Sequence, residues 1–372
     1  MQFSQNIIKT GITMSGTITD FTKQQIEDLV VSLGEPAYRS RQILNRVYQR
    51  LAWTFEEMAD LPRGLREKLS DKLPVHGLEE QHLQTGADGT VKGLFRLADG
   101  KTVEAALMLY RKSGGGGRCT VCVSTQVGCG IGCPFCATGK QGFERDLTGG
   151  EMVDQVLYFA RYLRDLSRES AEHENLPNIT NIVFMGMGEP LANYDELWKA
   201  IENLNSPEAF GLGARNITIS TAGLVPQIIR LGREKLQVGL AVSLHAGTNE
   251  LRDKLVPLNR KYPLEELMAA CREYYTGSGR RVSFEYVLFR GVNDSLQEAR
   301  SLAALLRGLN CHVNLIPANE TGNRNYQPPP GPAVTAFQDE LRRLNIKTTV
   351  RQSRGRDIDA GCGQLRSRLK DR

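Results

Sequence analysis

Apolar residues recur with helical spacing over residues 20–73. Ile26, Leu29 and Val30 have the spacing of one helix face, and the pattern resumes at Ile43. Glycine and proline residues interrupt the pattern twice. This punctuation predicts several short helices rather than one long helix.

Residues 75–117 have a different pattern, which predicts short strands joined by turns. Apolar and polar residues alternate over 82–84, 91–97 and 103–110, and the Asp-Gly pairs between them are typical of hairpin turns. The glycine run at 114–117 predicts a flexible hinge before the next domain.

From residue 118 onward, apolar strands alternate with stretches that are long enough for crossover helices, such as 150–164 and 194–204. This alternation favours a parallel α/β sheet, and six or seven such units favour a complete or incomplete barrel. The chain shows no repeat of fixed period. The strands are expected at 120–124, 179–185, 217–220, 238–244, 282–288, 313–317 and 348–352.

Polar residues follow four of these strands directly. The carboxyl ends of the strands of an α/β barrel lie at the same mouth, which is where such barrels bind their ligands. We therefore expect these four segments to point polar groups toward one site. They are Gly186–Pro190, Ser220–Gly223, Ser243–His245 and Asn319.

Composition narrows the class of protein. Apolar residues make up 40% of the 372 residues, which is enough for a folded core. No apolar run approaches the roughly 18 residues of a membrane span. The N-terminus lacks the features of a signal peptide, so a cytoplasmic protein is expected, with either Met1 or Met14 as its start. The formal net charge of +5 weakly indicates a polyanionic partner.

Positive residues in the N-terminal helical stretch alternate with aromatic ones. Arg39, Arg41, Arg46 and Arg50 lie close in sequence to tyrosine and tryptophan residues. One interpretation is a patch that faces RNA, and the other is an ordinary solvated helix face. The sequence leaves both interpretations open.

The cysteines are concentrated in one segment. Five of the eight lie between residues 119 and 136, which favours a metal or catalytic site over a disulfide framework in a cytoplasmic protein. Cys129, Cys133 and Cys136 have C-x3-C-x2-C spacing on a glycine-rich loop. Three thiolates suit a [4Fe–4S] cluster whose remaining iron is open for substrate chemistry.

Two other kinds of metal site have similar cysteine spacings. Cys119 and Cys122 form a C-x2-C pair, so a structural zinc site in a non-catalytic RNA-binding module is one alternative. A ferredoxin-type cluster in an electron-transfer protein is another, although it would need a fourth nearby thiolate. Cys271 and Cys311 suggest no role.

With this cysteine spacing ahead of an α/β barrel, the chain resembles the radical SAM superfamily, whose members bind S-adenosylmethionine (SAM) at the open iron. It also resembles the RlmN family of dual-specificity RNA methyltransferases over roughly residues 20–366. The segments that carry this second resemblance are 122–129, 135–143, 184–190, 242–246, 257–263 and 357–365.

The resemblance implies an incomplete TIM-type (β/α) barrel as the radical SAM core, with a small helical accessory domain before it. The implied division is an RNA-binding helical domain at 1–74, a β-rich connector at 75–117, the core barrel at 118–353 and a C-terminal segment at 354–372.

The resemblance also implies roles for single residues. Glu104 matches the family's proposed general base, Cys362 the cysteine that is methylated, and Cys122 the thiol that resolves the intermediate. Phe135 would pack near the adenine of SAM, or it belongs to the core. The cluster ligands would be Cys129, Cys133 and Cys136, and the SAM-contacting residues Gly188, Glu189, Ser220, Ser243, Leu244, His245 and Asn319.

The implied activity is methylation of carbon-2 of an adenosine in the peptidyl-transferase region of 23S ribosomal RNA and of the adenosine 3′ of the tRNA anticodon. Two SAM molecules serve each turnover, one as methyl donor to Cys362 and one as radical source, and the RNA is transiently bound to the protein. An external electron donor and a disulfide reductant complete the cycle. No membrane partner is expected, and the chain should be a monomer. The alternative is a Cfr-type enzyme, which methylates carbon-8 and confers antibiotic resistance.

Overall fold

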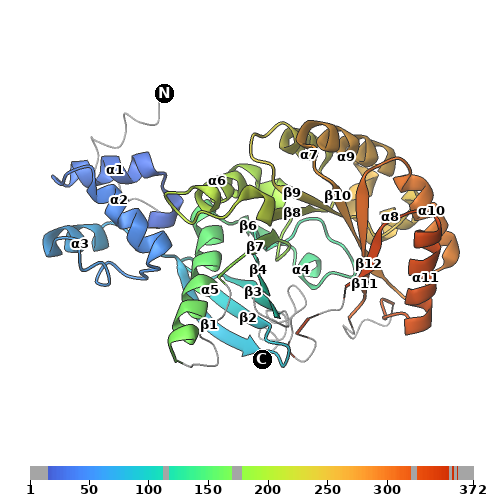
Figure 1. Ribbon diagram of the computed structural model, residues 1–372, viewed down its shortest axis with the longest axis horizontal. Helices are drawn as coiled ribbons and strands as arrows, with labels where there is room; N and C mark the ends of the chain where they lie inside the picture. The colour runs from blue at the N-terminus through green and yellow to red at the C-terminus, as the bar shows by residue number, and fades with distance from the viewer. Residues whose placement is uncertain are drawn as a thin grey trace.

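The computed structural model describes residues 16–111, 117–169, 178–319 and 325–351, together with residues 354, 355 and 358 (Figure 1). Two sequence predictions fall beyond this part of the chain. Cys362, with most of the C-terminal segment, lies outside the described residues, as does most of the glycine run at 114–117.

The N-terminal region is helical, as the apolar spacing predicts. The hydroxyl of Thr22 caps the first helix by accepting a hydrogen bond from the Gln25 main-chain nitrogen at 3.3 Å. Leu51, with a φ of 53°, lies just beyond the last turn of the second helical stretch. The elements are α1 (Lys23–Ser32), α2 (Arg39–Leu44), the π-helical turn η2 (Asn45–Gln49) and α3 (Arg63–Ser70).

Asp154 joins this helical region to the rest of the molecule. Its buried carboxylate accepts hydrogen bonds from Thr19 Oγ1 and from the Gly77 main-chain nitrogen, each at 2.8 Å, and lies 2.7 Å from His76 Nδ1. Asp154 belongs to α5 (Gly149–Glu169), a long helix beside the sheet. One satisfied carboxylate therefore holds three points of the N-terminal region against the core.

A ten-stranded sheet forms the centre of the molecule. Its strand order is β1-β2-β3-β4-β7-β8-β9-β10-β11-β12, and β1 to β4 are antiparallel neighbours. From β4 to β12 every neighbouring pair is parallel. The strands are β1 (Leu78–Thr85), β2 (Val91–Leu97), β3 (Thr102–Arg111), β4 (Gly117–Cys122), β7 (Asn181–Phe184), β8 (Ile217–Thr221), β9 (Gly239–Ser243), β10 (Val282–Leu288), β11 (Cys311–Pro317) and β12 (Thr348–Val350).

The prediction of an incomplete barrel is confirmed. Within the described residues β1 and β12 end the sheet without pairing to each other, so the sheet curves but does not close. Figure 1 shows α7, α9, α10 and α11 on its outer side and the short α4 inside the curve. The helices are α4 (Ala137–Lys140), α6 (Tyr194–Asn205), α7 (Val225–Gly232), α8 (Asn249–Leu255), α9 (Leu264–Ser278), α10 (Leu296–Leu306) and α11 (Gly331–Arg343).

The alternation of burial along β8 shows how the parallel part is layered. Ile217 and Ile219 are buried against the helices, whereas Thr218 and Ser220 between them are only half-buried, on the inner face. Successive side chains of a strand point to opposite faces, so one strand supplies both the core and the interior of the barrel. No helix of the described chain is long and apolar enough to cross a membrane.

The C-terminal residues bridge the open side of the barrel. Arg351, just after β12, lies 3.2 Å from a carboxylate oxygen of Glu285 on β10. Arg354 donates a hydrogen bond to the Leu109 carbonyl oxygen at 2.9 Å, and its guanidinium carbon lies 4.1 Å from the centre of the Tyr110 ring. The last strand of the barrel is thereby linked to the antiparallel part of the sheet.

Candidate functional site

The cysteine loop begins at a tight two-stranded ribbon formed by β5 (Gln126–Gly128) and β6 (Phe143–Asp146). Cys129, Cys133 and Cys136 are all half-buried and lie between these strands, and α4 begins directly after Cys136. Gly128 has a φ of 80°, and a Cβ atom there would collide with the Gly142 carbonyl oxygen. The glycines thus let the loop fold back closely on itself.

The three thiols of this loop influence one another. Burial, together with the nearby Glu189 and Cys136, raises the pKa of Cys129 to about 12, although a hydrogen bond from the Ile131 main chain opposes the rise. Burial also raises the pKa of Cys133, and its two partner cysteines add to the effect. Without metal, these raised pKa values favour the protonated thiols. Bound iron would favour the thiolates instead, because it binds that form. Three mutually close thiols on one loop therefore fit a [4Fe–4S] cluster with three protein ligands.

The zinc alternative does not fit the strand geometry. Cys119 and Cys122 both belong to β4, but Cys119 packs in the hydrophobic core while Cys122 is half-buried on the other face. Two residues three positions apart on a strand point to opposite faces and cannot share one metal ion. Within the part of the chain that the structure describes, no three His, Cys, Asp or Glu side chains are arranged for a single ion.

The segment after β7 meets the cysteine loop at the predicted mouth. Gly188 has a φ of 105°, and a Cβ there would lie 2.6 Å from Gln126 Cβ, so only glycine fits. Glu189 is buried, and its carboxylate accepts hydrogen bonds from the main-chain nitrogens of Ala222 at 2.7 Å and Leu191 at 3.1 Å. Burial raises the pKa of Glu189, and these hydrogen bonds oppose the rise.

The ends of β8 and β9 contribute the next residues of the mouth. Ser220 and Ser243 are half-buried on the inner face, and Leu244 and His245 follow β9 directly. His245 has a φ of 62°, an uncommon value for a residue other than glycine. Its ring lies edge-on to Phe135, with 5.2 Å between the ring centres.

The protonation of His245 follows from its surroundings. Burial and the positive charge of Arg252 lower the pKa of His245 to about 3. Its Nδ1 atom accepts a hydrogen bond from the Val287 main-chain nitrogen at 3.1 Å, so the neutral ring carries its hydrogen on Nε2. His245 therefore offers a hydrogen-bond donor at the mouth without a charge.

Three titratable residues meet on the inner face of the antiparallel strands. Lys92 pairs with Ala106 and Ala106 with Cys122 in the strand register, and Glu104 lies two residues from Ala106 on the same face. Lys92 Nζ lies 2.8 Å from Glu104 Oε2, and both side chains are buried. The register thus brings together the two predicted catalytic residues, Glu104 and Cys122.

The pKa of Cys122 reflects this arrangement. Burial raises the pKa of its thiol to about 11. A hydrogen bond from the Met185 main chain and the charges of Lys92 and Arg351 oppose the rise, whereas Glu104 adds to it. Cys122 is therefore a thiol at neutral pH, with two positive groups near enough to favour the thiolate.

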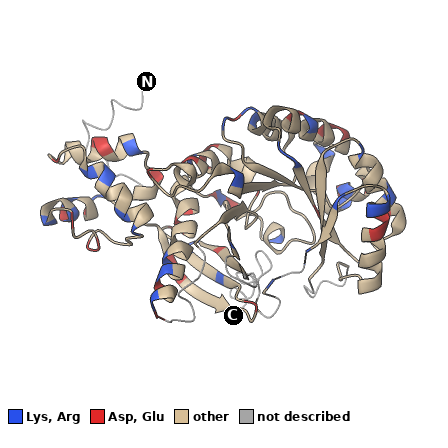
Figure 2. Ribbon diagram, in the orientation of Figure 1, with Lys and Arg blue, Asp and Glu red and all other residues tan. Residues whose placement is uncertain are grey.

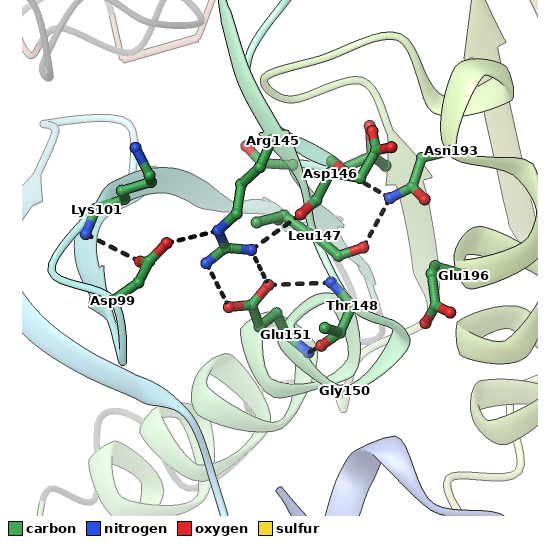
Figure 3. A network of polar contacts seen from close by, with 12 residues as sticks. Asp99, Lys101, Arg145, Asp146, Leu147, Thr148, Gly150, Glu151, Asn193 and Glu196 are labelled. Atoms are coloured by element: carbon green, nitrogen blue, oxygen red, sulfur yellow. Dashed lines mark hydrogen bonds and ion pairs between the residues drawn. The ribbon is translucent and has the colours of Figure 1, made fainter. Parts of the chain in front are cut away.

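A polar network anchors the strand that returns from the cysteine loop (Figure 3). Arg145 on β6 binds both carboxylate oxygens of Glu151 at 2.8 Å, and its Nε atom lies 2.6 Å from Asp99. Asn193 donates a hydrogen bond to the Leu147 carbonyl oxygen at 2.7 Å. These contacts tie β6 to the turn between β2 and β3 and to the first turn of α5.

Comparison with known proteins identifies the family. Residues 123–303 match the model of the radical SAM superfamily, and residues 17–75 match the ribosomal RNA large subunit methyltransferase N-terminal domain. The chain is 47% identical over 344 residues to the probable dual-specificity RNA methyltransferase RlmN of Moorella thermoacetica, covering 92% of this chain and 95% of that protein. The chain belongs to the RlmN family.

Two further proteins are similar to this chain over nearly its whole length. The probable RlmN protein of Geobacillus kaustophilus is 44% identical over 352 residues, which is 95% of this chain and 93% of that protein. The crystal structure of a radical SAM methyltransferase from Sphaerobacter thermophilus has a TM-score of 0.88 and 48% identity, and covers 94% of this chain and 98% of that one. The predicted radical SAM fold is thereby confirmed.

The structure describes most of the site residues that the RlmN resemblance predicted, but it does not bring all of them to one place. Asn319 is exposed beyond the end of β11, at the edge of the described chain. Cys362 lies outside the described residues. The catalytic, SAM-binding and metal-binding roles of the residues that the structure does place stay predictions.

Sequence reasoning missed several residues of this RlmN site. Lys92 could have been noticed as a cation within the run of otherwise apolar residues that begins β2. Gln126 accepts a hydrogen bond from the Glu189 main-chain nitrogen at 2.8 Å, and nothing in its local sequence indicates this. Arg252 and Asn259 belong to a polar stretch that gives no sign of burial, although both are buried.

Proposed function

We propose that this chain is a radical SAM RNA methyltransferase that methylates carbon-2 of adenosine. The family and the radical SAM fold support the general class of reaction. The observation that carries the finer proposal is the position of Glu104 and Cys122. Both lie on one inner face of the sheet, although one residue belongs to the antiparallel connector and the other begins the parallel core.

Cys129, Cys133 and Cys136 would hold one [4Fe–4S] cluster, because their loop offers three close thiols and no neighbouring fourth ligand is required. When bound there, the cluster supplies the single electron that cleaves SAM reductively. Glu189, with its main-chain donors, and the Ser220, Ser243 and His245 edge of the mouth would orient the SAM molecule.

Three residues of the chain have separate roles in the methyl transfer. The Cys362 thiolate takes the methyl group of a first SAM, which leaves as S-adenosylhomocysteine; a second SAM serves as radical source. Carbon-2 of adenine is electron-poor, so the methyl carbon must be activated on the protein before it bonds to the base. Glu104 takes the carbon-2 proton, and the Lys92 ammonium orients its carboxylate.

Cys122 completes the turnover. Its thiolate attacks the Cys362 sulfur, a disulfide forms, and the electron pair of the broken carbon–sulfur bond stays with the methylated base. The carbon that keeps this electron pair takes up a proton and becomes the methyl group. Before this step, the adduct formed when the methyl carbon bonds to the base as a radical gives up one electron, which would return to the oxidised cluster, and its carbon-2 proton, which Glu104 takes. Over the whole cycle the two cysteine thiols lose two electrons and two protons, so an external dithiol must reduce the disulfide before the next cycle. The electron that starts SAM cleavage also comes from an external donor.

RNA is the proposed substrate, because the relatives are named dual-specificity RNA methyltransferases. Of the possible RNAs, we propose 23S ribosomal RNA and tRNA, as the family resemblance implies. The target base must leave its stack to reach a mouth inside the barrel, which favours loops and single strands. The proposed division of labour keeps residues 1–74 as the RNA-binding domain, 75–117 as the connector, 118–353 as the core and 354–372 as the segment that carries Cys362. We propose that the enzyme works as a monomer.

Charge on the N-terminal helices is mixed rather than uniformly positive (Figure 2). Arg46 lies 2.7 Å from Asp60, and Arg39 lies 3.9 Å from Glu35. Arg41 and Arg50 form no ion pair within the described chain and remain the better candidates for phosphate contacts. The sequence left open whether these arginines face RNA or only solvent. The proposal that they face RNA therefore depends on Arg41 and Arg50.

The test is product analysis with protein whose cluster has been assembled without oxygen. A ribosomal RNA fragment is incubated with SAM and dithionite, digested, and its nucleosides are compared with standards by mass spectrometry. We expect 2-methyladenosine together with 5′-deoxyadenosine. 8-Methyladenosine would replace our proposal with the Cfr-type alternative, and an intact cluster without either product would contradict the assignment of the substrate.

A further inference from the structure

Arg252 is a charged side chain in the interior of the protein. It belongs to α8, is 0% exposed, and takes part in no ion pair within the described residues. Burial lowers the pKa of Arg252 to about 10, which leaves the guanidinium charged at neutral pH. A buried charge without an opposite charge is costly, so its surroundings must compensate for the loss of water.

Hydrogen bonds provide part of this compensation. The Nε atom of Arg252 donates to the Leu244 carbonyl oxygen at 3.1 Å, and Nη2 donates to the carbonyl oxygens of Ala222 at 2.6 Å and Ser243 at 3.3 Å. Its Nη1 atom donates to Asn259 Oδ1 at 2.9 Å. The planar guanidinium thus holds the ends of two strands in a fixed relation.

These carbonyl groups belong to the mouth of the barrel. Ala222 follows β8, which carries Ser220. Ser243 ends β9, and Leu244 follows it just before His245. The main-chain nitrogen of Ala222 also donates to Glu189. One side chain therefore fixes the backbone from which the proposed SAM contacts arise, although it does not itself face the mouth.

The backbone at this point is shaped to admit the guanidinium. Gly223 has a φ of 115°, and a Cβ there would lie 3.4 Å from Arg252 Nη2 and 3.1 Å from a Leu267 methyl carbon. Asn259 is in turn held by its own side-chain nitrogen, which donates to Asp253 at 2.7 Å and to Asn249 at 3.0 Å. Arg252 therefore lies in a built and rigid setting.

Arg252 also lies near the cysteine loop. Cys133 packs against the apolar cluster that contains Leu255 and Val256 at the end of α8. The charge of Arg252 lowers the pKa of Cys133, against the larger effect of burial. The Asp253 carboxylate is linked to the guanidinium through Asn259 and also acts on its charge. A cluster bound through thiolates is anionic, and it would add a negative charge on the Cys133 side of this guanidinium.

We propose that Arg252 is a positioning residue that links the SAM pocket to the cluster: its guanidinium fixes the ends of β8 and β9, and its buried positive charge stabilises the reduced form of the cluster bound at Cys133. This inference rests on the proposed radical SAM function. A merely structural arginine would affect stability alone, whereas this one sets a SAM affinity and a reduction potential.

The test compares variants that separate charge from shape, using protein with a fully assembled cluster. In Arg252→Gln the charge is lost, so we expect a more negative midpoint potential and an at least tenfold higher dissociation constant for SAM. In Arg252→Lys the charge stays but the planar fork is lost, so SAM binding should weaken while the potential stays near that of the wild type. Midpoint potentials come from a spectroscopic redox titration and SAM affinities from equilibrium dialysis.

Two further variants complete the design. Arg233→Gln removes an exposed arginine that pairs with Glu273, and it should change neither quantity. Asn259→Ser loosens the guanidinium without removing its charge; it carries the test if Arg252→Gln fails to fold, and it should weaken SAM binding alone. Wild-type potential and SAM affinity in a folded, iron-loaded Arg252→Gln protein would overturn the inference. Absence of SAM binding in the wild type would instead contradict the proposed function.

Discussion

Lys92 Nζ lies 2.8 Å from Glu104 Oε2, and neither side chain is more than 4% exposed. The two residues sit diagonally across neighbouring antiparallel strands, because Lys92 pairs with Ala106 and Glu104 precedes Ala106 by two. We propose that the Glu104 carboxylate accepts a proton from RNA. The ammonium group of Lys92, which belongs to the protein itself, holds this carboxylate in place. Burial and the ion pair together hold the Glu104 carboxylate in place at the candidate active site.

Loss of the Lys92 charge should destabilise the protein and abolish methylation. Lys92→Met removes the positive charge beside a buried carboxylate, so we expect the free energy of unfolding to fall by about 3–5 kcal/mol. Urea denaturation of the metal-free protein measures this change. The matched control is Lys101→Met, whose partner Glu144 lies at 2.6 Å in a partly exposed pair and whose loss should cost at most about 1 kcal/mol. Equal effects of the two variants would contradict the importance of burial.

Cluster assembly should depend on the backbone at Gly128. Gly128→Ala places a methyl group against the Gly142 carbonyl oxygen and also disfavours a φ of 80°. Gly279→Ala is the control, because Gly279 has a φ of 66° with open space around it and should lose only about 1–2 kcal/mol of stability. We expect low iron content after reconstitution in the first variant and normal content in the second. Full iron loading of Gly128→Ala would show that the loop tolerates a wider path.

Removal of the resolving thiol should trap the covalent intermediate. In Cys122→Ala, RNA bound through Cys362 has no thiol to release it, so a protein–RNA adduct should accumulate and be visible on a denaturing gel. Cys119→Ala alters the same strand but on the buried, opposite face, and it should form no adduct. An adduct in both variants, or in neither, would count against Cys122 as the resolving residue.

Resolution of the adduct should accelerate with pH. Burial raises the pKa of Cys122 to about 11, so the thiolate is the minor form at neutral pH. We expect the release rate to rise about tenfold for each pH unit from 7 to 9. The same shift means that the folded state favours the protonated thiol, so its contribution to stability is present below about pH 8.5 and is lost as the pH rises toward 11. Rapid-quench measurement of release provides the profile, and a flat profile would mean that a base removes the thiol proton during the attack.

The C-terminal segment should depend on Tyr110 for its position. The guanidinium carbons of Arg118 and Arg354 lie 4.2 Å and 4.1 Å from the centre of this ring. Tyr110→Leu removes both contacts, each worth about 0.5–2 kcal/mol, and should lower the yield of a Cys122–Cys362 disulfide under mild oxidation several-fold. Tyr110→Phe keeps the ring and is the control. Quantitative mass spectrometry of the disulfide peptide tests this, and an unchanged yield in Tyr110→Leu would mean that the segment is positioned by other contacts.

The local pattern of residues was enough to predict many of the strands and helices, and to recognise the cysteine loop as a candidate site for an iron–sulfur cluster. The strands at 91–97 and 282–288 have the bounds that their apolar residues predicted, because a strand inside a covered sheet is rich in apolar residues wherever it lies in the sheet. Cys129, Cys133 and Cys136 could be recognised together since a short loop keeps its ligands close whatever surrounds it. Their resemblance to a known family added the rest of the candidate site.

Only the tertiary structure decided which distant residues meet. The zinc alternative failed because Cys119 and Cys122 point to opposite faces of β4. The C-x2-C spacing alone does not show this, since it is the same in a zinc site and in a strand. The Lys92–Glu104 pair depends on strand register, and the burial of Arg252 depends on the ends of β8 and β9 closing around it. Register and burial arise from contacts between segments far apart in the chain, and no local pattern of hydrophobic and polar residues encodes them.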